Sequence, residues 1–140
     1  MISIELPQTT KQYKTDHNIV YSCQYHVIWC PKFRREVLVP PLDKRLKELI
    51  SEKQEEYGYE VVAMEIMPDH VHLILDVDPR LGINKIVGQI KGWTAHSLRK
   101  EYPFLKSRLP SLWTRSKFIS TVGVVSLEVV KQYIADQKGK

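Results

Sequence analysis

The segment from residue 59 to residue 78 constrains the fold more than any other part of this 140-residue chain. Two runs rich in β-branched and aliphatic residues, 59–67 (YEVVAMEIM) and 70–78 (HVHLILDVD), are separated only by Pro68 and Asp69. So short a connection can join neighbouring strands only as an antiparallel hairpin, because a parallel crossover needs about a dozen residues or more. The sequence therefore predicts a sheet with at least one antiparallel pair.

The other periodic segments place helices and further strands around this hairpin. Strands are predicted over 19–30 and 112–123, and apolar residues at helical spacing predict helices over 40–58, 82–102 and 126–138. Residues 1–17 are expected to form a polar N-terminal arm, and 103–111 a loop. The order β-α-β-β-α-β with a final helix is typical of a ferredoxin-like or RRM-like α+β fold, in which two helices cover one face of an antiparallel sheet.

Composition favours a single soluble domain over residues 1–140. Hydrophobic residues make up 43% of the chain and charged residues 26%, and no apolar run approaches the roughly 20 residues that span a bilayer. We therefore expect no membrane partner and a cytoplasmic location, with Cys23 and Cys30 reduced. The net charge of +5 suggests a polyanionic partner such as nucleic acid, although charge alone does not establish one.

Two histidines interrupt the apolar run 70–78. Alternate residues of a strand face opposite sides of the sheet. One side would carry four aliphatic residues, Val71, Leu73, Leu75 and Val77. The other would carry His70, His72, Ile74 and Asp76. The aliphatic side is expected to meet the helices, so both imidazoles would lie together on the opposite side. They can either converge on a metal ion or be two ordinary surface histidines.

A metal site needs a further ligand, and the sequence leaves its identity open. The chain has no CxxC and no HExxH motif, which argues against the common zinc sites. Two imidazoles with an oxygen ligand would suit Mg²⁺ or Mn²⁺, and Asp69, Asp76 or the last helix could supply the oxygen. On that helix Tyr133 and Gln137 are four residues apart and share a face. Their spacing alone is equally compatible with a half-buried helix edge.

Several segments in this order resemble one enzyme family. The His-hydrophobic-His motif in MPDHVHLIL (67–75) resembles the HUH endonucleases. With YHVIWCPKFRRE (25–36), LWTRSKFISTVG (112–123) and a tyrosine four residues before a glutamine, the chain resembles the single-tyrosine transposases of small palindrome-bounded bacterial insertion sequences. The resemblance extends from about residue 18 to 138.

This resemblance implies a site and a reaction. His70, His72 and Gln137 would bind a divalent ion, Mg²⁺ or Mn²⁺, and Tyr133 would be the nucleophile. The enzyme would cut and rejoin single-stranded DNA at hairpin-bounded ends through a 5′-phosphotyrosine intermediate. It would act as a homodimer with shared active sites, in a bacterial cytoplasm and at the nucleoid when bound to DNA.

Basic and aromatic residues near the strand ends are candidate DNA contacts. The candidates are Lys32, Arg34, Arg35, Trp113, Arg115 and Lys117. Cationic side chains can follow phosphates and tryptophan can stack on an unpaired base, but each of these residues can equally be a solvated charge or a core aromatic. His26 could contact DNA or be a structural histidine.

The competing hypothesis is a non-catalytic, single-stranded nucleic-acid-binding module of RRM-like fold. Tyr21, Tyr25 and Trp29 would share one face of the first strand, as base-stacking aromatics do in such modules. The chain has no match to the RNP1 pattern of RRM domains.

Overall fold

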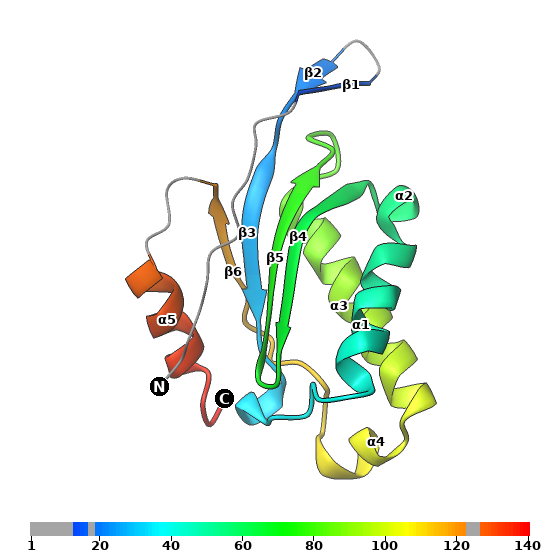
Figure 1. Cartoon of the computed structure of the whole chain (residues 1–140), viewed down its shortest axis with the longest axis vertical. Coiled ribbons are helices and arrows are strands. Elements are labelled where there is room, and N and C mark those ends of the chain that lie inside the picture. Colours follow the sequence, from blue (N-terminus) through cyan, green and yellow to red (C-terminus); the bar gives the residue numbers. More distant parts are fainter. Residues whose placement is uncertain (1–12, 17–18, 123–126) are drawn as a thin grey trace.

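A computed structural model describes residues 13–16, 19–122 and 127–140 of the chain, without the side chains of 16 and 127–129. Its main sheet is antiparallel, in the order β4 (Tyr59–Met67), β5 (His70–Val77), β3 (Gln24–Trp29) and β6 (Phe118–Thr121) (Figure 1). Met67 lies opposite His70, so β4 and β5 form the predicted hairpin around Pro68 and Asp69. The predicted α+β class with an antiparallel sheet is confirmed.

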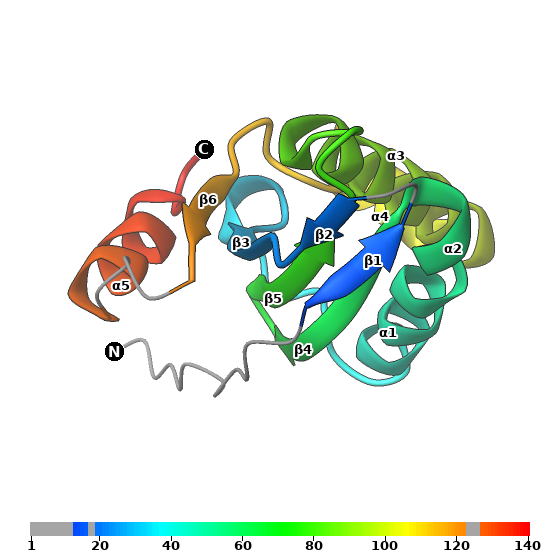
Figure 2. The ribbon, with the colours of Figure 1, turned by 90° about the horizontal axis from the view of Figure 1, so that it is seen from above.

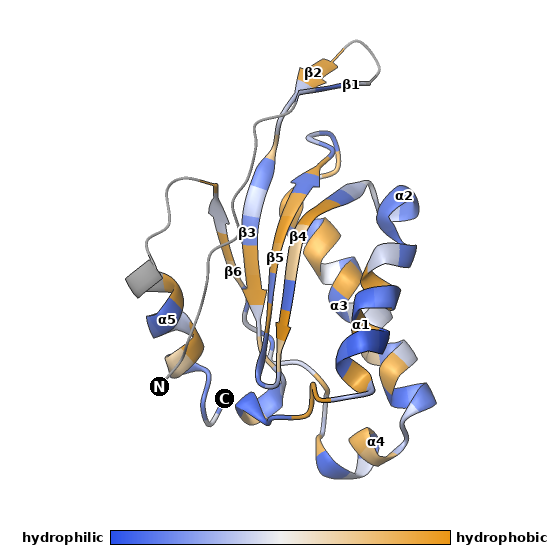
Figure 3. Ribbon diagram, in the orientation of Figure 1, coloured by the Kyte–Doolittle hydropathy of each residue, from blue (hydrophilic) through white to orange (hydrophobic). Residues whose placement is uncertain are grey.

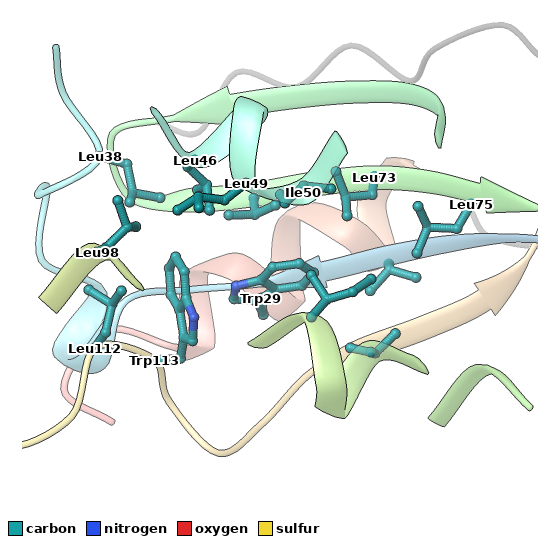
Figure 4. Packing of buried hydrophobic residues seen from close by; sticks show 14 of the residues in the cluster. Trp29, Leu38, Leu46, Leu49, Ile50, Leu73, Leu75, Leu98, Leu112 and Trp113 are labelled. Carbon is teal, nitrogen blue, oxygen red and sulfur yellow. The ribbon is translucent and has the colours of Figure 1, made fainter. Parts of the chain in front are cut away.

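One face of this sheet is covered by α1 (Leu42–Glu52) and α3 (Ile83–Glu101) (Figure 2). The apolar stripe of α1 (Leu42, Leu46, Leu49 and Ile50) is buried, as its helical spacing predicts. These residues pack with Ile86 and Ile90 of α3 and with the aliphatic side of β5 in one continuous core (Figure 4). The predicted helix 40–58 is interrupted at Lys53. A short helix, α2 (Gln54–Tyr57), follows, and Gly58 ends it with a left-handed φ of 80°.

The opposite face of the sheet meets α5 (Leu127–Asp136), which lies on the far side from α1 and α3 (Figure 2). Val130 and Ile134 of α5 are buried against Ile28 and Cys30, in a small second apolar cluster. In Figure 3, β5 is hydrophobic over most of its length with hydrophilic residues near its ends, and β3 passes from hydrophilic to hydrophobic. Residue 126, the expected start of this helix, lies outside the described residues.

The N-terminal part differs from the prediction. The expected strand 19–30 is divided into β2 (Ile19–Tyr21) and β3, and β2 pairs with β1 (Lys14–Asp16) in a separate two-stranded sheet. This hairpin projects beyond the main sheet (Figure 1). Val20 is 67% exposed, so a residue whose β-branched side chain suggested a buried strand lies at the surface. Residues 14–16, predicted within the polar arm, are a strand, whereas 1–12 and 17–18 are not described.

The segment between α3 and α5 also differs. The predicted loop 103–111 contains α4 (Phe104–Arg108), which Pro103 precedes and which buries Leu105 in the main core. The predicted strand 112–123 was wrong over 112–117, because only β6 pairs with β3 and Trp113 forms an isolated bridge with Pro31. Trp113 explains this difference, since its side chain enters the main core, edge-on to Trp29 with ring centroids 5.8 Å apart.

None of the described helices is long and apolar enough to cross a bilayer.

Candidate functional site

The histidines of β5 lie on the face of the sheet that α5 covers. His72 pairs with Ile28 across the β5–β3 ladder, and Ile28 pairs with Phe118 of β6. Residues directly opposite one another in a ladder share a face. Ile28 also packs against Val130 of α5. The sheet therefore places His72 on the side that carries the C-terminal helix, as its alternation with the aliphatic residues predicted.

Both histidines are buried, and each has one ring nitrogen bonded and one without a partner. His70 is 2% exposed and His72 is fully buried. His70 Nδ1 lies 2.9 Å from Asp69 Oδ1, and His72 Nε2 lies 3.1 Å from Nδ1 of His26. Among the described residues, neither His70 Nε2 nor His72 Nδ1 has a hydrogen-bond partner. Because an unpaired buried polar atom costs about 1–3 kcal/mol, these two nitrogens are favourable positions for a bound ligand.

The electrostatics keep these nitrogens available as lone-pair donors. Burial lowers the pKa of His72 to about 4, with smaller contributions from His26 and His70, so the ring is neutral at pH 7. The hydrogen bond from His70, together with the nearby Arg34 guanidinium, lowers the pKa of Asp69, which stays a carboxylate and accepts the Nδ1–H of His70. The tautomer of His70 is thereby set, with its lone pair on Nε2.

Gln137 follows α5, and its side chain bonds to residues other than the two histidines. Its side chain is 3% exposed. Its Oε1 accepts from Thr114 Oγ1 at 3.4 Å, and its Nε2 donates to the carbonyl of Tyr133 at 3.3 Å. Both distances exceed the usual 2.7–3.2 Å of such bonds, so they are readily exchanged for another partner. Thr114 is in turn joined to the sheet, because its N–H donates to the carbonyl of Cys30, the residue that follows β3.

The two unpartnered imidazole nitrogens are donors of a type that divalent metals accept. Within the described residues, no three His, Cys, Asp or Glu side chains gather closely enough to hold an ion. A buried amide oxygen such as Gln137 Oε1 is a ligand type outside that set. Asp76, an alternative oxygen donor in the sequence, accepts the N–H of Cys23 at 3.2 Å.

Tyr133 lies one helical turn before Gln137 and is half-buried. Its ring packs against Phe118 at 5.4 Å between centroids, and its Oη lies 2.9 Å from Ser116 Oγ. Burial raises the pKa of Tyr133 to about 12, while the hydrogen bond to Ser116 acts in the opposite direction. The phenol is therefore protonated in this state, held in one position by Ser116.

Lys91 holds the segment that carries Ser116. Its Nζ donates to the carbonyls of Thr114 at 2.7 Å and Ser116 at 3.2 Å. Burial, followed by repulsion from Lys117, lowers the pKa of Lys91 to about 8. Sequence reasoning missed Lys91 and Ser116, and it left His26 undecided. No motif marks them, since each acts through a contact that depends on the folded chain.

The candidate DNA contacts differ in their exposure and in their bonds within the molecule. Trp113 is 6% exposed, and its Nε1 bonds to Lys91 O and Thr94 Oγ1, so in this structure it is a core aromatic, one of the two alternatives that the sequence left open. Arg34 is engaged within the molecule, with Nε 3.4 Å from Asp69 Oδ2 and a bond to the carbonyl of Ile134.

Four further candidates, Lys32, Arg35, Arg115 and Lys117, are exposed or half-buried and remain predictions. Arg115 and Lys117 precede β6 and do not share a strand face with Trp113.

The aromatic face expected of an RRM-like binding module is turned inward. Trp29 is fully buried in the core beneath the helices, and Tyr25 is packed against the same core. Neither ring lies on the face that carries the histidines, so the observation that favoured the non-catalytic hypothesis is removed.

Comparison with known proteins identifies close relatives. The family model described as "Transposase IS200 like" matches residues 19–137. ISDra2 transposase TnpA of Deinococcus radiodurans is 38% identical over 129 residues, covering 91% of this chain and 92% of the relative. The transposase for insertion sequence element IS200 of Salmonella typhimurium is 24% identical over 119 residues, or 84% of this chain and 78% of the relative.

Solved structures agree with the fold. The crystal structure of a candidate transposase from Deinococcus radiodurans superposes with a TM-score of 0.82 at 34% identity, covering 91% of this chain and 99% of the other. A REP-associated tyrosine transposase bound to a REP hairpin gives a TM-score of 0.56 at 13% identity, covering 92% and 68% respectively, which supports the fold alone. With a family model matched over most of its length, the chain belongs to the IS200-like transposases.

Proposed function

We propose that this transposase cuts and rejoins single-stranded DNA through a covalent 5′-phosphotyrosine on Tyr133, with the help of a divalent metal. The observation that carries the proposal is the buried histidine pair, whose two unpartnered ring nitrogens lie on the sheet face covered by the helix of Tyr133. Buried donors without partners beside a positioned phenol are the parts that such a reaction needs.

His70 Nε2, His72 Nδ1 and Gln137 Oε1 are the proposed ligands of the ion, Mg²⁺ or Mn²⁺. When bound, the ion supplies Lewis acidity, which polarises the scissile phosphate and offsets its developing charge. Asp69 and His26 act behind the ligands, since each bonds the second ring nitrogen of one histidine and so holds its orientation.

Tyr133 performs the covalent step. Its Oη forms a bond to phosphorus while the bond from phosphorus to the 3′ oxygen breaks, leaving a phosphotyrosine and, after protonation, a 3′-OH. The phenol loses its proton in this step, and Ser116 Oγ, 2.9 Å away, is the nearest described group that can accept a hydrogen bond from it. Because the phosphoester energy is retained, a 3′-OH can later attack the phosphotyrosine and rejoin strands.

The proposed substrate is single-stranded DNA with hairpin ends. The chain carries a net charge of +5, which favours a phosphate backbone, and the solved REP-associated relative is described as bound to a REP hairpin. Lys32, Arg35, Arg115 and Lys117 are the proposed backbone contacts.

The decisive experiment incubates the protein with 5′- and 3′-labelled hairpin DNA and Mg²⁺, followed by a denaturing protein gel. We expect an adduct with only the label on the 3′ side of the cut, absent in Tyr133→Phe and absent in EDTA. Tyr102→Phe is the matched control and keeps the adduct. An adduct in Tyr133→Phe would place the nucleophile on another residue.

Gln137 is tested by two replacements. Gln137→Glu keeps an oxygen but adds a negative charge, which strengthens metal binding and reduces the Lewis acidity of the ion. We expect slower adduct formation with an altered preference between Mg²⁺ and Mn²⁺. Unchanged rates in both Gln137→Glu and Gln137→Ala would remove Gln137 from the metal site.

We further propose a homodimer with shared sites, in which the histidines of one subunit work with Tyr133 of the other. In the single chain α5 packs on its own sheet, but the apolar contact is small, since Val130 and Ile134 meet only Ile28 and Cys30 among the fully buried apolar residues described there. Exchange of an identical helix between subunits therefore costs little free energy.

The shared-site proposal is tested by mixing two inactive chains under conditions that exchange subunits. One carries His70→Ala and His72→Ala, and the other carries Tyr133→Phe. Shared sites place both defects in one site of the heterodimer and leave the second intact, so we expect adduct formation to return. A mixture that stays inactive would show that each chain builds its own site, without affecting the proposed chemistry.

A further inference from the structure

Phe33 is held at the surface by an unusual backbone conformation. It lies in the turn Lys32–Arg34 with φ 59° and ψ 16°, and the next residue, Arg34, has φ 51°. L-residues with bulky side chains rarely adopt this left-handed region, where Cβ crowds the backbone at a cost of about 1–2 kcal/mol per residue. Two backbone hydrogen bonds hold these residues in this conformation. The Phe33 N–H donates to the carbonyl of Lys140, and the Arg34 N–H donates to the carbonyl of Pro31.

The contacts of Arg34 with Asp69 and Ile134 do not account for the conformation of Phe33. The Phe33 side chain is 39% exposed and belongs to neither apolar cluster of the described residues. Backbone strain is found disproportionately at binding and catalytic sites, where the surrounding fold maintains it. An exposed aromatic ring that is kept in a strained conformation therefore indicates a ligand-binding surface.

The ring borders an open pocket of about 580 Å³, and one residue of its lining contacts a proposed metal ligand. That residue is Asp69, which bonds to His70, and Arg35 and Lys138 lie on the same lining. Arg34 and Asp69 pair with each other, so Arg35 and Lys138 leave one cation in excess over the remaining carboxylate, Glu36. The pocket thus combines an exposed aromatic ring with cations, and Asp69 connects its wall to His70.

We propose that Phe33 is the stacking platform for one unpaired base of the bound single strand, next to the nucleotide that reaches the metal site. Arg35 and Lys138 contact the phosphates on either side of that base. Aromatic rings beside cationic side chains are the arrangement by which single strands are held without base pairing. This inference rests on the proposed function and identifies a contact that sequence analysis, which considered only the basic neighbours of Phe33, did not name.

Phe104 provides a matched control within the same chain. It is 42% exposed, and its ring lies 5.3 Å from the Arg108 guanidinium, as the Phe33 ring lies 5.3 Å from Lys32 Nζ. Phe104 starts α4, however, and does not line the pocket beside Asp69. The two phenylalanines therefore share exposure and a cationic neighbour but differ in location and backbone conformation.

The test measures binding of a fluorescein-labelled hairpin with a single-stranded flank by anisotropy, in EDTA so that no cleavage occurs. We expect Phe33→Ala to weaken binding about 5- to 100-fold, the range that corresponds to the loss of one base–aromatic stack. Phe33→Trp should keep the affinity of the original chain, and Phe104→Ala should leave it unchanged. Equal affinity in Phe33→Ala and the original chain would overturn the inference.

An abasic scan locates the stacked base. Removing the bases of the single-stranded flank one at a time should weaken binding to the original chain most at one position, and Phe33→Ala should be insensitive at that position alone. Equal sensitivity at every position in both proteins would contradict a stacking role. If the original chain binds the flank and forms the Tyr133 adduct while Phe33→Ala behaves identically, only this inference fails. If it forms no adduct, the proposed function fails.

Phe33→Gly separates a structural role from a binding role. Glycine adopts a positive φ without strain, so we expect a melting temperature at least equal to that of the original chain, together with weakened DNA binding. A lower melting temperature in Phe33→Gly and Phe33→Ala alike, with binding lost in proportion, would show that the ring serves the fold and would overturn the inference.

Discussion

On one face of the sheet β5 presents only aliphatic side chains to α1 and α3, whereas on the other it presents two histidines and an aspartate, all buried. The first face belongs to one large apolar core, and the second has a small apolar cluster under α5 with polar groups beside it. Burial of apolar area is the main source of stability, and a buried polar group detracts from it unless it is paired. Apolar burial on the first face therefore stabilises the fold, and this stability allows buried polar groups to be kept on the second face.

Two consecutive residues of β5 test this division most directly. Leu73→Ala should lower the free energy of unfolding by about 2–5 kcal/mol, because it opens a cavity in the main core. Where still folded, this variant should form the adduct. His72→Ala should abolish the adduct with a much smaller loss of stability. Urea unfolding and the adduct gel measure the two effects. A folded Leu73→Ala chain without activity would show that the faces are not separable.

His26 sharpens the comparison, because it lies on the second face and touches no proposed substrate. Its Nδ1 lies 3.1 Å from His72 Nε2, and it accepts from that atom in the tautomer that leaves His72 Nδ1 free for the proposed ion. His26→Phe should therefore leave His72 without this support and weaken metal binding about 10- to 100-fold. Mn²⁺ binding measured by paramagnetic resonance of the free ion gives this value. His26→Gln retains an acceptor and should recover part of the affinity. Equal Mn²⁺ affinity in His26→Phe would show that the hydrogen bond does not position His72.

The second face should also make the metal-free protein sensitive to acid. The pKa of His72 is lowered from 6.5 to about 4, and burial lowers that of His26 as well. Between these values the unfolded chain binds more protons than the folded chain, so stability is fully present above about pH 6.5 and is lost as pH falls toward 4. Urea unfolding at pH 7.5, 5.5 and 4.5 measures the slope. His26→Phe combined with His72→Leu should flatten it, and an unchanged slope would assign it to other groups.

The smallest effect is expected from the exposed ion pairs between α1 and α3, the helices that cover the aliphatic face of the sheet. Arg45 of α1 makes two bonds to Glu101 of α3, at 2.8 and 3.1 Å, in a largely solvent-accessible position. Exposed ion pairs contribute about 0–1 kcal/mol, so Arg45→Ala should change the free energy of unfolding by no more than that and leave the adduct unchanged. A loss above 2 kcal/mol would mean that helix pairing, rather than the apolar core, dominates this face.

Much of the architecture follows from periodicity alone. Alternation along 70–78 was sufficient to separate the histidines from the core, because the side-chain period of a strand leaves no other choice once one face is aliphatic. Prediction failed where tertiary contacts decide. Trp113 suits a strand by propensity but leaves the ladder to fill the core against Trp29, and Val20 suits a buried strand but lies exposed on a projecting hairpin.

The sequence named the proposed ligands and nucleophile but not the residues that support them. The paired histidines, Tyr133 and Gln137 were named from sequence, whereas their neighbours depend on strand register and on an irregular segment. Ser116 meets Tyr133 only through the path of residues 113–117, and His26 meets His72 only because β3 pairs with β5 as it does. Pair contacts between distant segments leave no periodic signal in one sequence.

The tryptophans have a spectroscopic consequence. Trp29 and Trp113 pack edge to face in the main core, and Trp93 packs against that core with its Nε1 donating to the carbonyl of Leu49. All three tryptophans of the chain therefore lie on the side of the sheet that α1 and α3 cover. Their fluorescence therefore reports the melting of the main core, whereas Tyr133 of α5 is one of seven tyrosines and gives no signal of its own. A difference between tryptophan emission and the signal of a fluorophore attached to α5 would resolve release of that helix from loss of the core.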